Sequence, residues 1–238
     1  MREAPFYQPI TTAGEPVLNH IEVRVVVFSL RNDRLQVLLI AEPDGEEWAL
    51  PGSRVPLDKS LEATATESVL RLTGLREAFL EQLYTYGDTW RTAGGQRLVS
   101  VAYFAIIPGG ASQNTENAAP IHKDDCQACW FPVDDLPALI MDHREVASYA
   151  LRRLRYKLEY TAVGFQLLPE KFSLSELQHV YETILGEKID KRNFRRRILQ
   201  AGIIEETEHL RSSEGRPARL YRYRPDAVAE AKARRLFP

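Results

Sequence analysis

The sequence predicts a protein of the α+β or α/β class, in which a mixed β-sheet sandwiched by helices is followed by a small unit of helices and strands. Segments rich in β-branched residues alternate with one amphipathic segment between residues 20 and 133. Helical periodicity replaces this pattern from Asp142 onwards. The 238 residues, 44% of them hydrophobic, are enough for one large domain or two ordinary ones.

Four segments have the pattern of β-strands. His20–Leu30 alternates in polarity, and Leu35–Glu42 follows it after an Asn-Asp turn, so the two predict a β-hairpin. A third strand is expected at Arg97–Ile107 and a fourth around Cys129–Val133. Together these segments predict the mixed sheet.

A helix is predicted between the second and third strands, over Ser60–Leu72. Its apolar residues recur at the spacing of one helix face, and Gly74 stands where a helix-ending glycine is expected. These apolar residues are Leu61, Ala65, Val69 and Leu72. We expect this face to pack on the sheet.

A second helix is predicted from Asp142 to Tyr160. Asp142 and Glu145 have the spacing of an N-cap and an acidic third residue. The connector that follows contains Gly164 and Pro169, so a domain boundary is expected within residues 160–172. We therefore divide the chain into residues 1–160 and 161–238.

The C-terminal unit has the element order of a winged helix-turn-helix. Ser173 and Glu176 form a capping-box pattern for a helix that Gly186 ends. A short basic helix is expected between Asp190 as N-cap and Gly202. Two strands around a turn follow it.

Charge is distributed unevenly along the chain. The net charge is −2, but residues 171–238 are net basic and residues 1–170 are net acidic. A basic C-terminal unit favours a polyanionic partner, and ordinary compositional scatter is the alternative.

Membrane and secreted classes are disfavoured by the sequence. The longest mostly apolar stretch, near residues 21–40, is interrupted by charged residues, and the N-terminus lacks the apolar run of a secretory signal. We expect a cytoplasmic protein with no membrane contact. No cofactor is expected.

The two cysteines, Cys126 and Cys129, form one C-x-x-C pair near His122 and His143. A structural zinc site needs four ligands, and there is no second cysteine pair. Two reduced thiols near a strand are the favoured interpretation, with zinc as the minor alternative, and no metal site is predicted.

The segment ALPGSRVPLDKSLEATATESVLRLTGL, residues 49–75, resembles the Nudix box in its LPG turn and its closing Gly74-Leu75. The family pattern places an acidic residue early in the loop and three more on the helix. Counting back without a gap, these four positions hold Lys59, Ser68, Arg71 and Leu72. The scaffold of the motif is present, whereas each catalytic acid is replaced.

This replacement removes the expected metal chemistry. Helix positions 68, 71 and 72 share one face, on which three carboxylates would hold Mg²⁺ against a diphosphate. A hydroxyl, a guanidinium and an isobutyl group cannot do so. We therefore expect no enzyme activity and no catalytic residue, with a site rebuilt from Glu62, Glu67 or Asp88 as the alternative.

A ligand pocket can remain in the domain although the metal ligands are replaced. Arg54 follows the LPG turn, and Arg91 and Arg97 flank a glycine-containing loop. Arginines hold diphosphates or carboxylates through forked hydrogen bonds without metal. These three are the predicted effector contacts, and solvated loop charges are the alternative.

The basic helix and the following turn are the predicted DNA-binding surface. Phe194 and Ile198 are expected to face the core, which leaves cations on the outer arc. The predicted DNA contacts are Lys191, Arg192, Asn193, Arg195 and Arg196 on the helix and Arg216 and Arg219 on the wing. A solvated cationic helix and a polar turn are the alternatives.

In this order, the degenerate Nudix box, the segment WFPVDDLPALIMDH, the basic helix and GRPARLY resemble the NrtR family of Nudix-related transcriptional regulators over nearly the whole chain. The resemblance implies a homodimeric bacterial repressor that binds an operator palindrome in double-stranded DNA. It also implies a Nudix domain that binds an effector, ADP-ribose being the favoured one, and control of NAD metabolism genes.

Two departures from the family concern the effector. The box reads GSRVPLDK, and the loop reads WRTAGGQR where many relatives have Arg-Asp followed by Pro-Arg-Gly. ADP-ribose is therefore the favoured effector, with a sugar effector and control of sugar catabolism as the alternative. The rival functions are an active Nudix pyrophosphatase and a module that binds RNA or protein through the basic unit.

Overall fold

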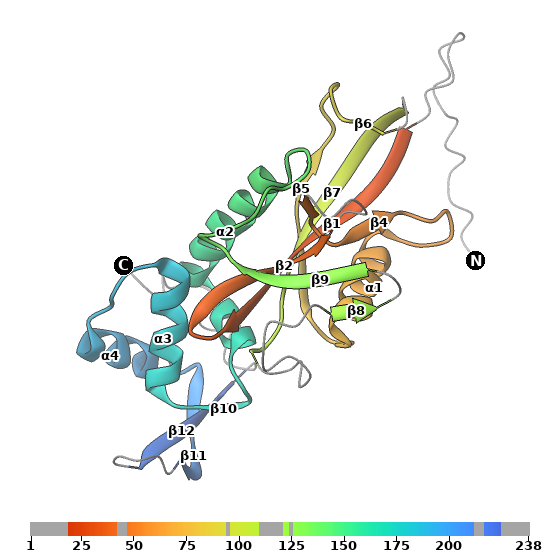
Figure 1. Ribbon diagram of the computed structural model, residues 1–238. Coiled ribbons are helices and arrows are strands. Elements are labelled where there is room, and N and C mark those ends of the chain that lie inside the picture. Colours follow the sequence, from red (N-terminus) through yellow and green to blue (C-terminus); the bar gives the residue numbers. More distant parts are fainter. Residues whose placement is uncertain are drawn as a thin grey trace, which may run out of the picture.

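Two β-sheets and four α-helices make up the described part of the computed structural model, which covers residues 19–41, 47–93, 96–109, 121–123, 126–211 and 217–224 (Figure 1). In chain order the elements are β1 Asn19–Arg31, β2 Arg34–Ala41, β3 Trp48–Ala49, β4 Gly52–Arg54, α1 Leu61–Thr73, β5 Phe79–Tyr86, β6 Thr92–Ala93, β7 Gln96–Ile106, β8 Ile121–Lys123, β9 Cys126–Pro132, α2 His143–Tyr160, the 3₁₀ helix η1 Val163–Leu167, β10 Lys171–Phe172, α3 Leu174–Leu185, α4 Lys191–Ala201, β11 Ile204–Arg211 and β12 Ala218–Tyr223.

The large sheet is mixed, as predicted. Its main order is β5-β7-β1-β2-β9-β8, in which β1 and β7 are parallel and the other neighbours antiparallel. The predicted hairpin is β1–β2, and its turn residues Asn32 and Asp33 have φ values of 48° and 56°. Asn and Asp tolerate this left-handed conformation better than most residues, which explains their place in a two-residue hairpin turn.

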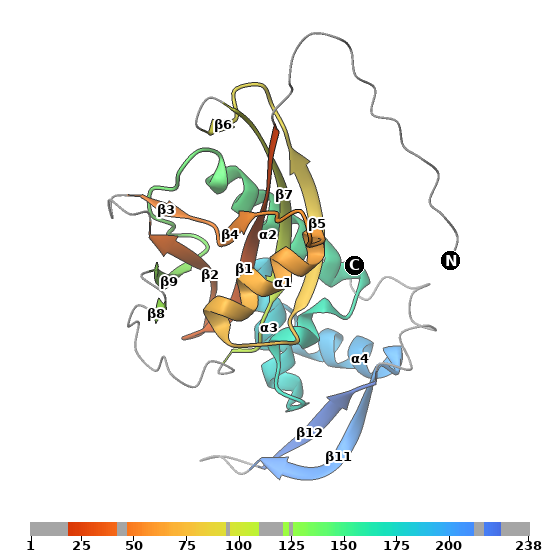
Figure 2. The same ribbon diagram turned by 90° about the vertical axis from the view of Figure 1, so that its right-hand side faces the viewer.

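Helices cover both faces of this sheet (Figure 2). On one face, Val23, Val25 and Val27 of β1 pack against α1 through Ala65, Val69 and Leu72. On the other face, Val26 and Phe28 belong to a second cluster with Val146, Ala150 and Leu154 of α2. Strand alternation therefore assigns successive β1 residues to different layers.

The ends of α1 agree with the prediction. Ser60 accepts a hydrogen bond from the Ala63 amide at 3.1 Å, and Gly74 ends the helix with φ 77°. Glycine takes this conformation without steric cost, which is why it closes the motif.

The predicted N-cap of α2 is wrong in its chemistry. Asp142 precedes the helix, but its side chain makes no capping hydrogen bond. Its carboxylate instead forms an ion pair with the buried guanidinium of Arg91. A charge that would otherwise be buried alone competes more strongly for this carboxylate than a backbone amide does.

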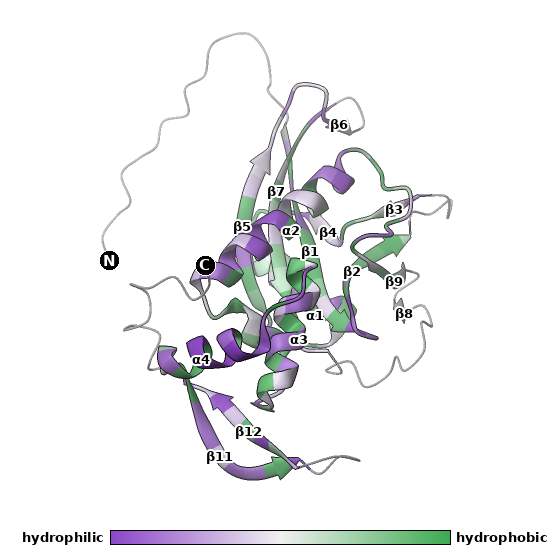
Figure 3. Cartoon of the chain, turned by 90° about the vertical axis from the view of Figure 1, so that its left-hand side faces the viewer, coloured by the Kyte–Doolittle hydropathy of each residue, from purple (hydrophilic) through white to green (hydrophobic). Residues whose placement is uncertain are grey.

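The C-terminal unit has the predicted winged-helix order. The Ser173–Glu176 capping box is formed, and Asp190 caps α4 by accepting from the Asn193 amide at 2.8 Å. Strands β10, β12 and β11 make a three-stranded sheet beside α4, which is strongly hydrophilic along its length (Figure 3).

Helix α2 packs against the C-terminal unit. Arg155 donates its Nε–H to the main-chain oxygen of Ile184 at 2.7 Å, and Gly164 lies against Leu158 and Tyr181. One buried cluster continues from β1 through α2 into α3 and α4. The division of the chain at residue 160 therefore stays a prediction.

No helix within the described residues is long and apolar enough to cross a membrane.

Candidate effector pocket and DNA-binding surface

The Nudix-box helix keeps its position on the sheet without its acidic face. Ser68 and Leu72 are 4% and 3% exposed and face the sheet, whereas Arg71 is exposed to solvent. The hydroxyl of Ser68 donates to the main-chain oxygen of Thr64 at 2.9 Å. Two of the three helix positions that would hold metal ligands are thus closed by packing.

One of the remaining acids near this helix, Glu67, is engaged by a neighbouring cation. Glu67 forms an ion pair with Lys59 at 2.5 Å, and the hydrogen bond and charge of Glu67 raise the pKa of the Lys59 amine. Across the described residues, no group of three His, Cys, Asp or Glu side chains is arranged to hold a metal ion.

Close packing explains the glycine of the LPG turn. A Cβ atom at Gly52 would lie 2.0 Å from the carbonyl oxygen of Val23, so only glycine allows β4 to approach β1 there. The preceding residue Pro51 accepts a hydrogen bond from the Val25 amide at 2.7 Å.

A buried network of charged side chains lies between the large sheet and α2. Glu22 accepts hydrogen bonds from Ser100 and from Arg24, at 2.5 and 2.7 Å. Arg91 donates to Ser100 at 2.6 Å and pairs with Asp142. Charges of both signs are present, so each buried ion has a partner, as burial requires.

His143 extends this network at the first residue of α2. Its Nδ1 accepts a hydrogen bond from the Leu50 amide at 3.1 Å, which fixes the neutral tautomer with hydrogen on Nε2. Complete burial, together with the nearby charges of Arg24 and Arg91, lowers the pKa of His143 to about 3. The imidazole is therefore neutral at physiological pH.

Sequence reasoning missed this network, although β1 carried a signal for it. Glu22 and Arg24 occupy the same strand face as Val26 and Phe28, which are fully buried. Side chains alternate between the two faces of a strand, so two charged residues of opposite sign on the same face as core residues predict a buried ion pair.

The three predicted effector arginines do not form one cluster. Arg91 is fully buried, whereas Arg54 and Arg97 are exposed. Arg54 lies opposite Glu22, which lies opposite Ser100, so these three share one face of the sheet. Arg97 is three residues from Ser100 on β7 and faces the other side.

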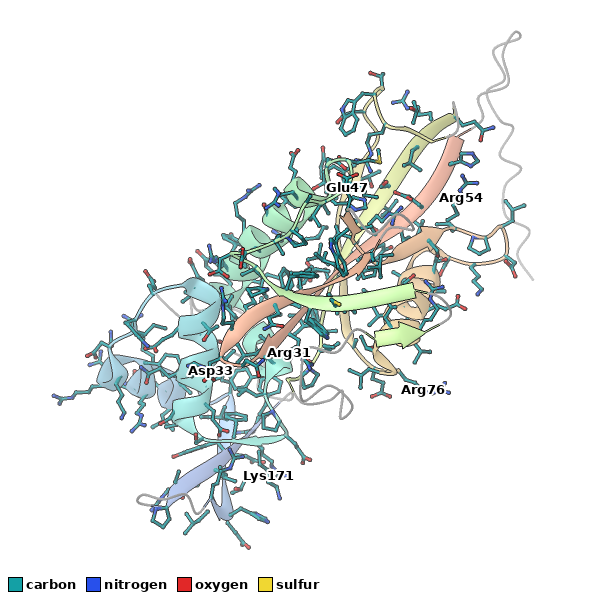
Figure 4. All side chains as sticks on the ribbon, viewed as in Figure 1. Arg31, Asp33, Glu47, Arg54, Arg76 and Lys171 are labelled. Carbon is teal, nitrogen blue, oxygen red and sulfur yellow. The ribbon has the colours of Figure 1, made fainter. Side chains whose placement is uncertain are left out.

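Arg54 occupies the end of the sheet that is remote from α3 and α4 (Figure 4). Arg97 donates to the main-chain oxygen of Gly87 and so holds the loop that carries Arg91. Direct contact between Arg91 and an effector would require its pair with Asp142 to open. The effector roles of these three arginines stay predictions.

The residues considered for the alternative zinc site are only partly within the described structure. The side chains of Cys126 and His122 lie outside it. Cys129 is on β9, and His143 uses Nδ1 to accept from the Leu50 amide. One candidate ligand is thus already engaged in the fold.

Helix α4 exposes three of the four cations that were predicted to lie on its outer arc. Phe194 and Ile198 are each 1% exposed and face the core, while Lys191, Arg192 and Arg196 are exposed. The arrangement of these cations on one surface suits a phosphate-rich partner.

Arg195 and Asn193 are less free than the sequence suggested. Arg195 is half-buried and donates to the Ser175 hydroxyl at 3.0 Å, which ties α4 to α3. Asn193 accepts a hydrogen bond from Arg196 at 2.8 Å. Their predicted DNA contacts require these surface hydrogen bonds to be exchanged.

The wing is the β11–β12 hairpin. Arg219 pairs with Glu206 at 2.5 Å, and Arg222 pairs with Glu205. All four side chains are at least partly exposed, so each arginine can exchange its carboxylate for a phosphate at little cost. Arg216 lies outside the described residues.

Comparison with known families gives two matches along the chain. The model described as the NUDIX domain matches residues 20–154, and the model described as the NrtR DNA-binding winged helix domain matches residues 164–223. Both fold types were predicted, and the predicted fold class is confirmed.

Individual proteins resemble the chain over most of its length. The ADPR responsive transcriptional repressor NtrR of Acinetobacter baylyi is 36% identical over 208 residues, covering 84% of this chain and 80% of that protein. The crystal structure of Shewanella oneidensis NrtR complexed with a 27mer DNA has a TM-score of 0.75 and 34% identity, covering 88% of this chain and 95% of the other. A MutT/nudix family protein from Enterococcus faecalis, with a TM-score of 0.69, 24% identity and coverage of 87% and 88%, shares the fold.

Proposed function

The chain belongs to the NrtR family, and we propose that it is a DNA-binding transcriptional repressor whose Nudix domain binds ADP-ribose without hydrolysing it. The observation that carries this proposal is the joint presence of a Nudix helix with buried Ser68 and Leu72 and a winged helix with an exposed basic α4. The first feature disfavours metal-dependent hydrolysis, and the second favours binding to nucleic acid.

DNA binding follows from the geometry of the C-terminal unit. In helix-turn-helix proteins the second helix lies in the major groove, which here is α4. Its first turn carries Lys191 and Arg192, with Arg196 further along, and these cations displace counterions from the phosphates. We expect the wing arginine Arg219 to contact the backbone beside that groove.

ADP-ribose is proposed as the effector on the basis of the relative from Acinetobacter baylyi, whose name describes it as ADPR responsive. Arg54 is a solvent-exposed guanidinium beside the Nudix turn and can form forked hydrogen bonds with a diphosphate. We further propose a homodimer in the cytoplasm, whose two-fold symmetry matches a palindromic operator near NAD metabolism genes.

Regulation requires that ADP-ribose bind one arrangement of the two α4 helices better than another. We expect ADP-ribose to weaken operator binding. The test measures affinity for duplex fragments tiling the promoters of NAD biosynthesis genes, with and without saturating ADP-ribose at fixed salt. An unchanged affinity would show that ADP-ribose is not the effector, and sugars would be tested next.

The absence of hydrolysis is tested separately. The purified protein is incubated with ADP-ribose and a panel of nucleoside diphosphates in the presence of Mg²⁺ or Mn²⁺, and product formation is followed. We expect no turnover above a no-protein control. Metal-dependent turnover that is lost in a Glu62→Gln, Glu67→Gln or Asp88→Asn variant would instead support a rebuilt hydrolase site.

A further inference from the structure

Helix α2 is anchored to the regions assigned to both functions. Its 18 residues span roughly 27 Å at 1.5 Å per residue. Its first turn contacts the buried charged network of the large sheet, and its last turns contact α3. A rigid helix with anchors at both ends transmits a displacement at one end to the other.

Two of the contacts at the N-terminal end of α2 involve the buried charged network. Asp142 pairs with Arg91, and His143 accepts the hydrogen bond from the Leu50 amide. Asp142 is 8% exposed at its side chain and Arg91 is fully buried, so water cannot readily replace either partner. The pair with Arg91 is therefore one of the contacts that hold the start of the helix.

The loop that carries Arg91 is open to ligands on its outer side. Trp90 is 56% exposed, and the guanidinium carbon of Arg91 lies 5.5 Å from the centroid of its ring. The exposed Arg97 donates to Gly87 at the start of the same loop. A ligand that contacts Trp90 on this outer surface would touch a residue that lies directly against Arg91.

The C-terminal half of α2 meets the DNA-binding unit. The hydrogen bond from Arg155 to Ile184 fixes α2 against the last turn of α3. Arg195 of α4 in turn donates to Ser175 at the first turn of α3. These contacts connect α2 to α4 through both ends of α3.

We propose that Arg91 is a positioning residue, whose buried ion pair with Asp142 couples effector occupancy at the Nudix domain to the placement of α4 through helix α2. This inference rests on the proposed function. In this role Arg91 acts through Asp142, and it does not need to contact the effector directly. The structure holds this ion pair closed, and the inference requires that the effector favour a second state in which the pair is displaced.

The test separates coupling from binding. Operator affinity is measured with and without saturating ADP-ribose, and ADP-ribose affinity is measured by calorimetry, for the wild type and for Asp142→Asn. In the wild type we expect the effector to change operator affinity on the order of tenfold or more. In Asp142→Asn we expect this ratio to fall below about threefold, while each separate affinity stays within about threefold of wild type.

Conservative and matched variants exclude a merely structural role. Asp142→Glu retains the charge and is expected to restore part of the effector response. Asp134→Asn breaks the exposed pair with Arg34, 2.8 Å in length, and is expected to keep the full response. Arg155→Met removes the contact with Ile184 at the other end of α2 and is expected to lose coupling as Asp142→Asn does.

The outcomes are distinguishable. Wild-type coupling in both Asp142→Asn and Arg155→Met overturns the inference and leaves the proposed function standing. If thermal melting shows that Asp142→Asn is unfolded, the inference is tested with Arg155→Met alone, and wild-type coupling in that variant overturns it. A wild-type protein that does not respond to ADP-ribose removes the proposed effector and the inference with it.

Discussion

The hydroxyl of Ser68 donates a hydrogen bond to the main-chain oxygen of Thr64, 2.9 Å away within helix α1. Ser68 stands at a position where the Nudix pattern has a metal-binding glutamate. The short side chain folds back onto its own helix, and Leu72 one turn later packs into the sheet. Ser68 and Leu72 therefore belong to the packed side of α1 and stabilise the domain.

Restoring an acid at this face should therefore damage the fold. Because Leu72 is 3% exposed, the Leu72→Glu variant buries a carboxylate without a partner, at an expected cost of roughly 3 kcal/mol in the free energy of unfolding. Urea denaturation measures the change. Arg71→Glu, on the exposed side of the same turn, serves as the control and should stay within about 0.5 kcal/mol. Equal midpoints for the two variants would contradict this packing of α1.

The cap of the basic helix offers a second prediction. Asp190 satisfies the Asn193 amide, and its charge lies at the positive end of the α4 dipole. Asp190→Ala should reduce stability by about 1 kcal/mol. Calorimetric melting measures the effect, with Glu187→Ala, a nearby exposed acid before the helix, as the control. The prediction fails if both substitutions shift the melting temperature equally.

Local sequence patterns were sufficient for the four helices and for strands β1, β2, β7 and β9, whereas the eight-residue strand β5 was not predicted. The box at Ser173 and Glu176 and the glycines after α1, α3 and α4 act within a few residues of the helix that they delimit, so they can be identified without tertiary structure. The short strands β3, β4 and β8 have two or three residues and exist through pairing with distant strands. A segment of two or three residues is too short to show the alternation of a strand, so its sequence does not distinguish it from a loop.

The candidate site was harder to predict for the same reason. The Asp142 pattern suggested a cap, but the long-range pair with Arg91 determines what its carboxylate does. Arg91 belongs to a glycine-containing segment, which suggested exposure, and packing beneath α2 buries it. The exposure of Lys191, Arg192 and Arg196 was predicted correctly because Phe194 and Ile198 define the buried face of α4, whereas the contact between Arg195 and Ser175 was not predicted.

Acid should destabilise the protein through His143. Its pKa is about 3 in the folded state and 6.5 in the unfolded state, so the unfolded state binds more protons between these values. Stability is therefore greatest above pH 6.5 and decreases as the pH falls, by about 2 kcal/mol between pH 7 and pH 5 from this group. Urea denaturation at the two pH values measures the difference.

A variant without the imidazole isolates this contribution. His143→Asn keeps an acceptor for the Leu50 amide and should lose the part of the pH dependence that His143 supplies. His179→Asn removes a histidine of α3 that is exposed, and this variant should retain the pH dependence that His143 supplies. Identical pH dependence in the two variants would assign the acid sensitivity to other groups.

Specific DNA recognition is predicted to depend on exposed cations of α4. Arg196 is exposed at the protein surface, and Arg196→Ala should weaken operator binding by about 1–3 kcal/mol if the guanidinium reads a base edge. Binding to random duplex DNA would then change much less. An equal loss for both DNAs, with the salt dependence reduced by about one counterion, would assign Arg196 to phosphate contact. Lys188→Ala removes a cation before α4 that already pairs with Glu182 at 3.1 Å, and little change is expected there. Full operator affinity in Arg196→Ala would remove this residue from the DNA-binding surface and leave Lys191 and Arg192 to account for recognition.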